Sequence, residues 1–120
     1  MDKPSISKWF EELKRIWLEK DISALKEIIA NEFNYYEDPF LPPIQTWEDL
    51  ESAWQEVKEQ DIKKLKINVL IDGETDGSGS YDFAYEDTSG VLHETKGAYY
   101  LKLNSEGKAT EFRQWWTVQS

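Results

Sequence analysis

The spacing of apolar residues changes once along this chain, and the change restricts the possible folds. Up to Gln60 the apolar side chains recur every three or four residues, whereas beyond Asp61 they recur at every second residue. The first spacing is typical of helices that bury one face, and the second is typical of half-buried strands. The sequence therefore predicts an α+β fold, in which helices pack on one face of an antiparallel sheet.

The first half of the chain contains three predicted helices. The first runs from Ser5 to Lys20, and the second, shorter helix begins at Asp21, whose side chain suits an N-cap. Thr46 and Asp49 resemble a capping box at the start of the third helix, which we expect to end near Gln60. The three apolar stripes are Ile6, Trp9, Phe10, Leu13, Ile16 and Trp17; Ile22, Leu25, Ile28 and Ile29; and Trp47, Leu50, Ala53, Trp54 and Val57.

The second half contains four predicted strands, at residues 64–71, 81–86, 91–103 and 109–118. Glycine-rich polar turns separate them, at residues 72–79, 87–90 and 104–107. Short turns join neighbouring strands in antiparallel order, so we expect a curled sheet that packs against the helices. Residues 1–120 are predicted to form a single domain, because the chain is long enough to bury one core.

Charge and composition narrow the classes of partner. The chain has 24 acidic and 14 basic residues, a net charge of -10, which disfavours nucleic acid and anionic membranes. It has no cysteine, no segment of membrane-spanning length and no apolar stretch near Met1, so we expect a cytoplasmic protein. Six tryptophans, six tyrosines and five phenylalanines exceed the needs of an ordinary core, which predicts that some line a cavity or a subunit interface.

Metal and cofactor sites are not expected from the motifs. The acidic turn at residues 72–79 resembles the start of a calcium-binding loop, but Phe83 occupies the position of the bidentate glutamate and strands flank the turn. His93 is the only histidine, which excludes a histidine cluster. His93 either forms a structural hydrogen bond or faces solvent, or it carries protons together with Asp38.

A stiff acidic loop at residues 35–46 joins the second and third predicted helices. Pro39, Pro42 and Pro43 fix the backbone there. Glu37 and Asp38 are adjacent, so in an extended segment only one of them can face a cavity. Desolvation beneath aromatic walls would make such a carboxylate a base near neutral pH, whereas the alternative is that Asp38 only caps a turn before Pro39.

Aromatic residues occupy both faces of the last predicted hairpin. Tyr99 shares one face of its strand with Leu101 and Leu103, while the following strand carries Phe112, Gln114, Trp116 and Val118 on one face and Arg113 and Trp115 on the other. Rings on both faces predict a cavity beneath the helices and a homodimer through the sheet. The alternative for any single ring is ordinary cross-strand packing.

Several segments resemble those of the nuclear transport factor 2-like superfamily, in its SnoaL-like branch. They are the connection at residues 20–25, the run Glu37-Asp38-Pro39-Phe40 followed by Pro42-Pro43, and the ending at residues 100–108 and 111–116. The resemblance covers nearly the whole chain and implies a cystatin-like cone, with three N-terminal helices on a curved antiparallel sheet. The superfamily includes isomerases, dehydratases, epoxide hydrolases, cyclases and non-catalytic binding proteins, so the fold alone does not define the activity.

Around Asp38 the sequence is similar to ketosteroid isomerases, whose general base is the aspartate of an equivalent Asp-Pro-Phe segment. The similarity implies Asp38 as general base and Tyr99 as hydrogen-bond donor to a substrate carbonyl, with His93 as a further candidate. Leu13 stands where those enzymes have a tyrosine, and leucine cannot donate a hydrogen bond. The same alignment implies a pocket formed by Trp17, Trp54, Phe112, Gln114 and Trp116.

Two functions remain open at this level. In the first, the domain binds a small apolar or aromatic molecule without a cofactor, and Asp38 transfers protons in an isomerase-, cyclase- or dehydratase-like step. In the second, it is a non-catalytic ligand-binding or protein-interaction module. The orientation of Asp38 and the access of Tyr99 to the same cavity distinguish them.

Overall fold

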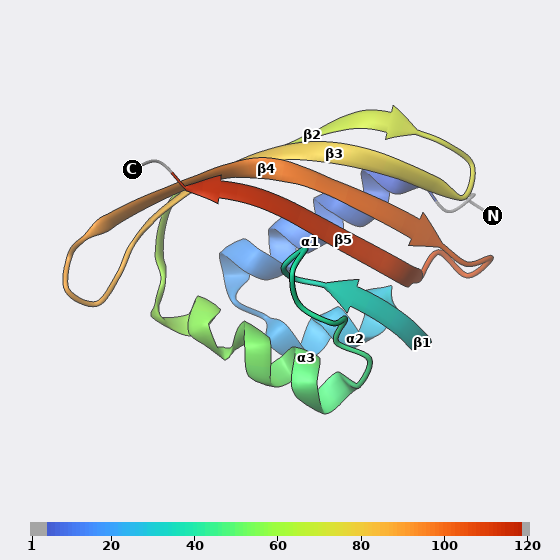
Figure 1. Ribbon diagram of the computed structural model, residues 1–120, viewed down its shortest axis with the longest axis horizontal. Coiled ribbons are helices and arrows are strands. Elements are labelled where there is room, and N and C mark those ends of the chain that lie inside the picture. The colour runs from blue at the N-terminus through green and yellow to red at the C-terminus, as the bar shows by residue number, and fades with distance from the viewer. Residues whose placement is uncertain (1–4, 119–120) are drawn as a thin grey trace.

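The structure is a computed structural model that describes residues 5–118. Helices dominate the first half of this range and strands the second, which confirms the predicted α+β class (Figure 1). The elements are α1 (Ile6–Glu19), the 3₁₀ segment η1 (Ile22–Ala24), α2 (Leu25–Ile28), β1 (Ile29–Tyr36), α3 (Trp47–Trp54), η2 (Gln55–Glu59), β2 (Asp61–Asp72), β3 (Asp76–Glu86), β4 (Leu92–Leu103) and β5 (Ala109–Val118).

The first helix matches its prediction within one residue at each end. Ser5 is its N-cap, and the Ser5 hydroxyl accepts a hydrogen bond from the Lys8 backbone N–H at 3.0 Å. Lys20 ends the helix in a left-handed conformation, with φ of 57°. The buried stripe runs from Ile6 to Ile16 and faces the sheet.

The second helix is shorter than predicted. It consists of η1 and the single turn α2, and strand β1 begins at Ile29, which we had placed in the helical stripe. Ile29 is buried in either assignment, so the apolar pattern cannot locate this boundary. The Trp9 indole N–H donates to the Ile28 carbonyl at 2.8 Å and ties the end of α2 to α1.

The third helix begins as predicted. The Thr46 hydroxyl accepts a hydrogen bond from the Asp49 backbone N–H at 3.2 Å. The α-helix ends at Trp54, and a 3₁₀ turn, η2, carries the chain on to Glu59. This continuation matters for the site because η2 contributes side chains to it.

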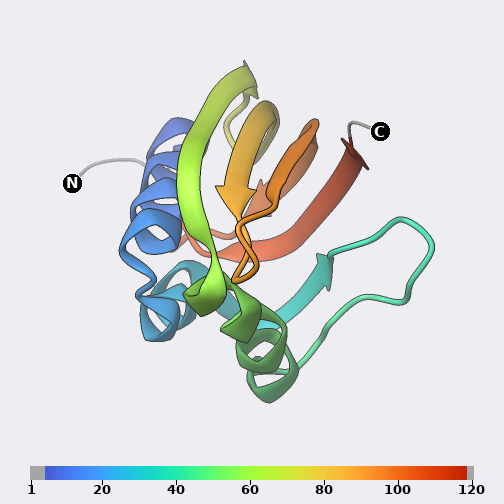
Figure 2. The same ribbon diagram turned by 90° about the vertical axis from the view of Figure 1, so that its left-hand side faces the viewer.

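The sheet has the strand order β1-β5-β4-β3-β2. Strands β2 to β5 form the predicted antiparallel meander, with Tyr99 opposite Gln114 and Tyr81 opposite Gly97. Strand β1 adds a fifth strand that pairs in parallel with β5, a contact that was not predicted. The sheet is strongly curved, and the helices lie on its concave side (Figure 2).

Strand β3 begins at Asp76, within the stretch predicted to be a turn. Gly77 and Gly79 suggested a loop, but they lie where the strand packs closely on its surroundings. A Cβ atom on Gly77 would lie 2.1 Å from the Ile71 carbonyl oxygen and 3.0 Å from the Ile6 side chain. Glycine at this position therefore permits close packing of the strand on α1 and β2.

One hydrophobic core lies between the helices and the concave face of the sheet. Aromatic rings dominate it, and the Trp9 and Phe112 ring centroids lie 5.5 Å apart.

Within residues 5–118, none of the helices has the length and apolar character needed to cross a membrane.

Candidate functional site

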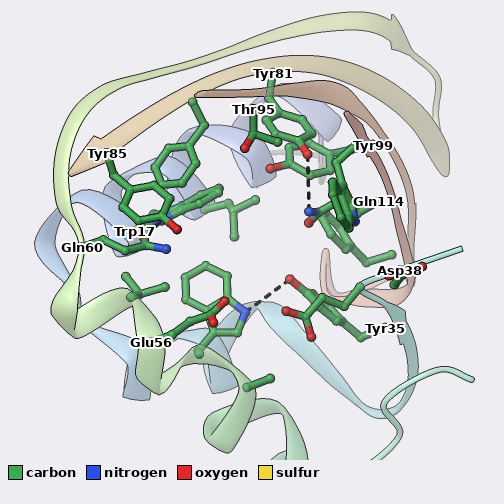
Figure 3. A pocket seen from close by; sticks show the side chains of 18 of the residues that line it. Trp17, Tyr35, Asp38, Glu56, Gln60, Tyr81, Tyr85, Thr95, Tyr99 and Gln114 are labelled. Carbon is green, nitrogen blue, oxygen red and sulfur yellow. Dashed lines mark hydrogen bonds between the residues drawn. The ribbon is translucent and has the colours of Figure 1, made fainter. Parts of the chain in front are cut away.

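The core does not fill the concave side of the sheet completely, and a cavity of about 440 Å³ remains (Figure 3). It lies between the sheet, helix α1, the α3–η2 segment and the proline loop after β1. Its lining residues are Leu13, Trp17, Tyr35, Glu37, Asp38, Leu41, Ala53, Trp54, Glu56, Val57, Gln60, Tyr81, Phe83, Tyr85, Thr95, Tyr99, Phe112, Gln114 and Trp116.

The five pocket residues implied by the sequence alignment all line this cavity. Trp17 projects from α1, and its ring centroid lies 4.5 Å from that of Phe83 and 5.7 Å from that of Trp54. Phe112, Gln114 and Trp116 line it from β5, because alternate residues of a strand share one face. The cavity therefore has aromatic walls on both the helical and the sheet side.

Strand β3 supplies three further rings that the sequence did not assign to the site. Tyr81, Phe83 and Tyr85 alternate along β3, and all three line the cavity. The signal for them was present in the alternation itself. The alternation alone could not assign these rings to the site, because the sequence does not show which face of β3 lies on the concave side of the sheet.

Two tyrosine hydroxyls in the cavity accept hydrogen bonds. The Tyr35 hydroxyl accepts from the Trp54 indole N–H at 3.2 Å, and the Tyr81 hydroxyl accepts from the Gln114 amide at 3.4 Å. Burial raises the pKa of Tyr35 above its ordinary range and raises the pKa of Tyr81 to about 12. Both hydroxyls therefore keep their protons at neutral pH and remain able to donate to a bound molecule.

Tyr99 and Gln60 present polar groups that have no protein partner. Tyr99 is 1% exposed, burial raises its pKa well above the ordinary value, and its hydroxyl forms no hydrogen bond with any residue of the described range 5–118. Gln60 is 8% exposed, and its Oε1 accepts from the Trp17 indole N–H at 3.2 Å, which leaves Nε2 unused within the same range. Both side chains point into the cavity (Figure 3).

Asp38 lies at the edge of the cavity rather than at its centre (Figure 3). Its Oδ1 accepts a hydrogen bond from the Phe40 backbone N–H at 2.9 Å, and its carbonyl accepts from the Leu41 N–H at 3.1 Å. This is the turn-capping geometry that the sequence left open for Asp38. Asp38 Oδ2 has no hydrogen-bond or ion-pair partner within residues 5–118.

Glu37 also lines the cavity, so the expectation that only one of the two adjacent carboxylates could do so was wrong. The physical reason is that β1 ends at Tyr36, and strand alternation does not continue into the turn beyond it. Burial raises the pKa of Glu37, and the nearby charges of Glu56 and Asp38 raise it further. Glu56, which sequence reasoning missed, reaches the cavity from η2.

His93 lies outside the cavity lining. Its Nε2 lies 2.8 Å from Asp87 Oδ2, and this hydrogen bond is the main cause of the lowered pKa of Asp87. The His93 ring stacks on Tyr85 with centroids 4.9 Å apart. These contacts place His93 beside the β3–β4 turn, and a structural hydrogen bond was one of the two roles expected for it.

Comparison with known proteins rests on structure alone. The sequence matches no protein-family model and no curated protein. The structure is similar to that of ketosteroid isomerase from Mycobacterium sp., with a TM-score of 0.82, 10% identity and coverage of 98% of this chain and 100% of that chain. It is similar to a nuclear transport factor 2-like protein from Burkholderia thailandensis, with a TM-score of 0.71, 17% identity and coverage of 98% and 92%.

A third similar structure is a Mycobacterium tuberculosis protein in complex with estradiol-17beta-hemisuccinate. The TM-score is 0.83 at 13% identity, and the match covers 97% of this chain and 95% of that chain. This chain has the nuclear transport factor 2-like fold. The fold implied by the sequence resemblance is thereby confirmed, whereas identities this low say nothing about shared chemistry.

The nuclear transport factor 2-like fold brings Leu13 and Tyr99 into one cavity, as the alignment implied. Leu13 offers no donor, so the hydrogen-bonding groups come from elsewhere: from Tyr35 on β1, Tyr81 on β3 and Gln60 after η2. No cluster of histidine, aspartate and glutamate side chains within residues 5–118 is arranged to hold a metal ion. The arrangement suits recognition of an organic molecule by rings and hydroxyl groups.

Proposed function

We propose that this protein binds a small, largely apolar molecule in the cavity. The observation that carries the proposal is a space of about 440 Å³ with aromatic walls on both sides and a few inward-facing hydroxyl and amide groups. Sites for small molecules typically combine such apolar walls with a few polar groups that fix orientation. The similar Mycobacterium tuberculosis structure, solved with estradiol-17beta-hemisuccinate, supports the proposal by analogy of fold.

A cavity-blocking variant tests this proposal. Ala53 lines the cavity from α3, and its neighbour Ser52 is exposed on the same helix. Ala53→Trp is expected to abolish the binding of naphthyl or steroid probes measured by calorimetry. Ser52→Trp adds the same ring outside the cavity and is expected to leave that binding unchanged. Equal binding by the two variants, with both shown to be folded by circular dichroism, would place the ligand elsewhere.

Acid–base catalysis on the bound molecule is a second candidate function. It is favoured by the free Oδ2 of Asp38 and the unpartnered hydroxyl of Tyr99, which line the same cavity. In this step the Asp38 carboxylate removes a proton from a carbon next to a carbonyl group, Tyr99 donates a hydrogen bond to the carbonyl oxygen, and the proton returns to a different carbon. This is the chemistry of an isomerase, and it requires no cofactor. We assign His93 no step in it, because His93 does not line the cavity and its Nε2 lies 2.8 Å from Asp87 Oδ2.

Hydrogen–deuterium exchange tests the catalytic proposal without a known substrate. A bicyclic ketone such as 2-tetralone has acidic C–H groups whose exchange in heavy water is followed by NMR. Asp38→Asn is expected to slow protein-catalysed exchange by about 10²-fold or more, while the exposed control Asp49→Asn leaves it unchanged. Exchange at the wild-type rate in Asp38→Asn would remove Asp38 as the base. Loss of the catalysed exchange in Glu37→Gln but not in Asp38→Asn would assign the role of base to Glu37.

We also propose that two copies associate through the convex face of the sheet. Trp115 is 44% exposed there, beside Arg113, whose guanidinium lies 4.0 Å from the centroid of the Tyr36 ring. A half-exposed tryptophan next to a stacked arginine is typical of the residues that dominate protein interfaces. Light scattering after size-exclusion chromatography is expected to give a dimer for the wild type and a monomer for Trp115→Glu. A monomeric wild type would contradict the proposal.

A further inference from the structure

The charges around the cavity all have one sign. Its lining contains the three carboxylates Glu37, Asp38 and Glu56 but no lysine, arginine or histidine. Within residues 5–118, none of the three forms an ion pair, and only Asp38 accepts a hydrogen bond. The excess of negative charge is therefore local to the cavity as well as general to a chain of net charge -10.

The negative charges of Glu56 and Asp38 both act on Glu37. Glu37 is half-buried, and its pKa is raised by burial, by Glu56 and by Asp38 in that order. The charges of Glu37 and Glu56 also raise the pKa of Tyr35 inside the cavity. The three side chains form no group that could hold a metal ion. A single positive charge on an organic molecule would relieve this repulsion at the place where it arises.

Besides its acidic residues, the cavity has other features that are typical of a ligand-binding site. The side chains of Tyr99 and Gln60 are more than nine-tenths buried, point into it and keep polar atoms without partners in the described structure (Figure 3). Trp17, Trp54 and Tyr85 line the same space. Aromatic faces attract organic cations as well as apolar rings, so both parts of an amphiphilic cation find partners here.

We infer that the molecule bound in this cavity is a protonated amine attached to an apolar, ring-containing body. Its ammonium group lies among Glu37, Asp38 and Glu56, and its rings extend inward against Trp17 and Trp54. This inference rests on the proposed function, because it names the class of ligand for the same cavity. It also predicts that carboxylic acids with the same apolar body are excluded.

A matched series of three compounds tests the sign of the preferred charge. The compounds are 2-naphthylmethylamine, 2-naphthylmethanol and 2-naphthoic acid, which share one ring system and at neutral pH are cationic, neutral and anionic. Calorimetric titration is expected to show binding of the amine about tenfold tighter than of the alcohol, and no measurable binding of the acid. The preference for the amine is expected to shrink as salt concentration rises, because salt screens the charges.

Substitution of one carboxylate at a time tests whether the preference for the amine over the alcohol arises in the cavity. Glu37→Gln and Glu56→Gln are each expected to reduce the ratio of amine to alcohol affinity about threefold, in proportion to the charge removed. Glu59→Gln is the matched control, because Glu59 lies on η2 with Glu56, is exposed and does not line the cavity. It changes the net charge equally and is expected to leave the ratio unchanged.

The possible results separate this inference from the proposed function. Binding of the alcohol as tightly as the amine would overturn the inference while leaving the proposed function intact. An equal loss of preference in Glu59→Gln and Glu37→Gln would also overturn it, since the effect would then come from general charge. Failure of all three compounds to bind the wild type would overturn the proposed function and the inference together.

Discussion

The hydrogen bond between Trp54 and Tyr35 joins α3 to β1 at the edge of the cavity, and its loss gives a measurable prediction. Tyr35→Phe removes only the acceptor oxygen, 3.2 Å from the Trp54 indole nitrogen. The two side chains are 5% and 7% exposed, so the indole N–H is left buried without a partner. That loss costs about 1–3 kcal/mol, and access of water through the cavity favours the lower half of the range.

The expected change in melting temperature follows from the size of the chain. For 120 residues the entropy of unfolding is about 0.25 kcal/mol per kelvin, so a cost of about 1–2 kcal/mol lowers the melting temperature by about 4–8 °C. Tyr36→Phe is the matched control, because Tyr36 is the next residue of β1, is only partly buried, and its hydroxyl forms no hydrogen bond within residues 5–118. It is expected to shift the melting temperature by less than about 2 °C.

A double-mutant cycle separates the hydrogen bond from other effects of the substitution. In a Trp54→Phe background the indole donor is absent, so Tyr35→Phe is expected to cost about 1 kcal/mol less than in the wild type. Calorimetric or denaturant unfolding of the four proteins measures this coupling. The same cost in both backgrounds, or a cost no larger than that of Tyr36→Phe, would refute the role assigned to the bond.

Two other predictions concern the sheet and the acidic loop. In Gly97→Ala the added Cβ would lie 1.9 Å from the Trp115 carbonyl oxygen and 2.8 Å from the Tyr81 ring. We therefore expect the free energy of unfolding, measured by thermal unfolding, to fall by about 1–3 kcal/mol. An unchanged melting temperature would show that β5 moves aside without cost. Because the folded-state pKa of Glu37 is raised above 4.5, its contribution to stability is present at low pH and lost as the pH rises through that pKa. Glu37→Gln is therefore expected to gain stability relative to the wild type as the pH of urea unfolding rises, and a constant or falling difference would contradict the assignment.

Local sequence signals predicted much of the fold. Ser5 and Thr46 cap helices where hydroxyl residues precede an apolar stripe. The two-residue spacing placed Tyr99, Leu101 and Leu103 on one face of β4, and all three are buried. The parallel pairing of β1 with β5 could not be predicted in this way. It joins residues far apart in sequence, such as Tyr35 and Phe112, and no local pattern records such a contact.

Several site residues on helices and regular strands could be predicted from the sequence, whereas most of those in turns could not. The family resemblance implied Trp17, Phe112 and Trp116 as pocket residues, and all line the cavity. Gln60 and Glu56 could not be found, because Glu56 lies in the 3₁₀ turn η2 and Gln60 directly follows it, and the orientation of that turn depends on tertiary packing. The same dependence explains Glu37, which faces the cavity only because the chain leaves the β1 direction beyond Tyr36.

The indole resonances of the six tryptophans provide the most direct test that a ligand occupies this cavity. Trp17, Trp54 and Trp116 line it, whereas Trp9, Trp47 and Trp115 do not. When the tightest-binding naphthyl compound is titrated into nitrogen-15-labelled protein, the indole N–H signals of the first three are expected to shift while the other three stay in place. Shifts confined to Trp9, Trp47 or Trp115, or spread equally over all six, would contradict binding between the sheet and the helices.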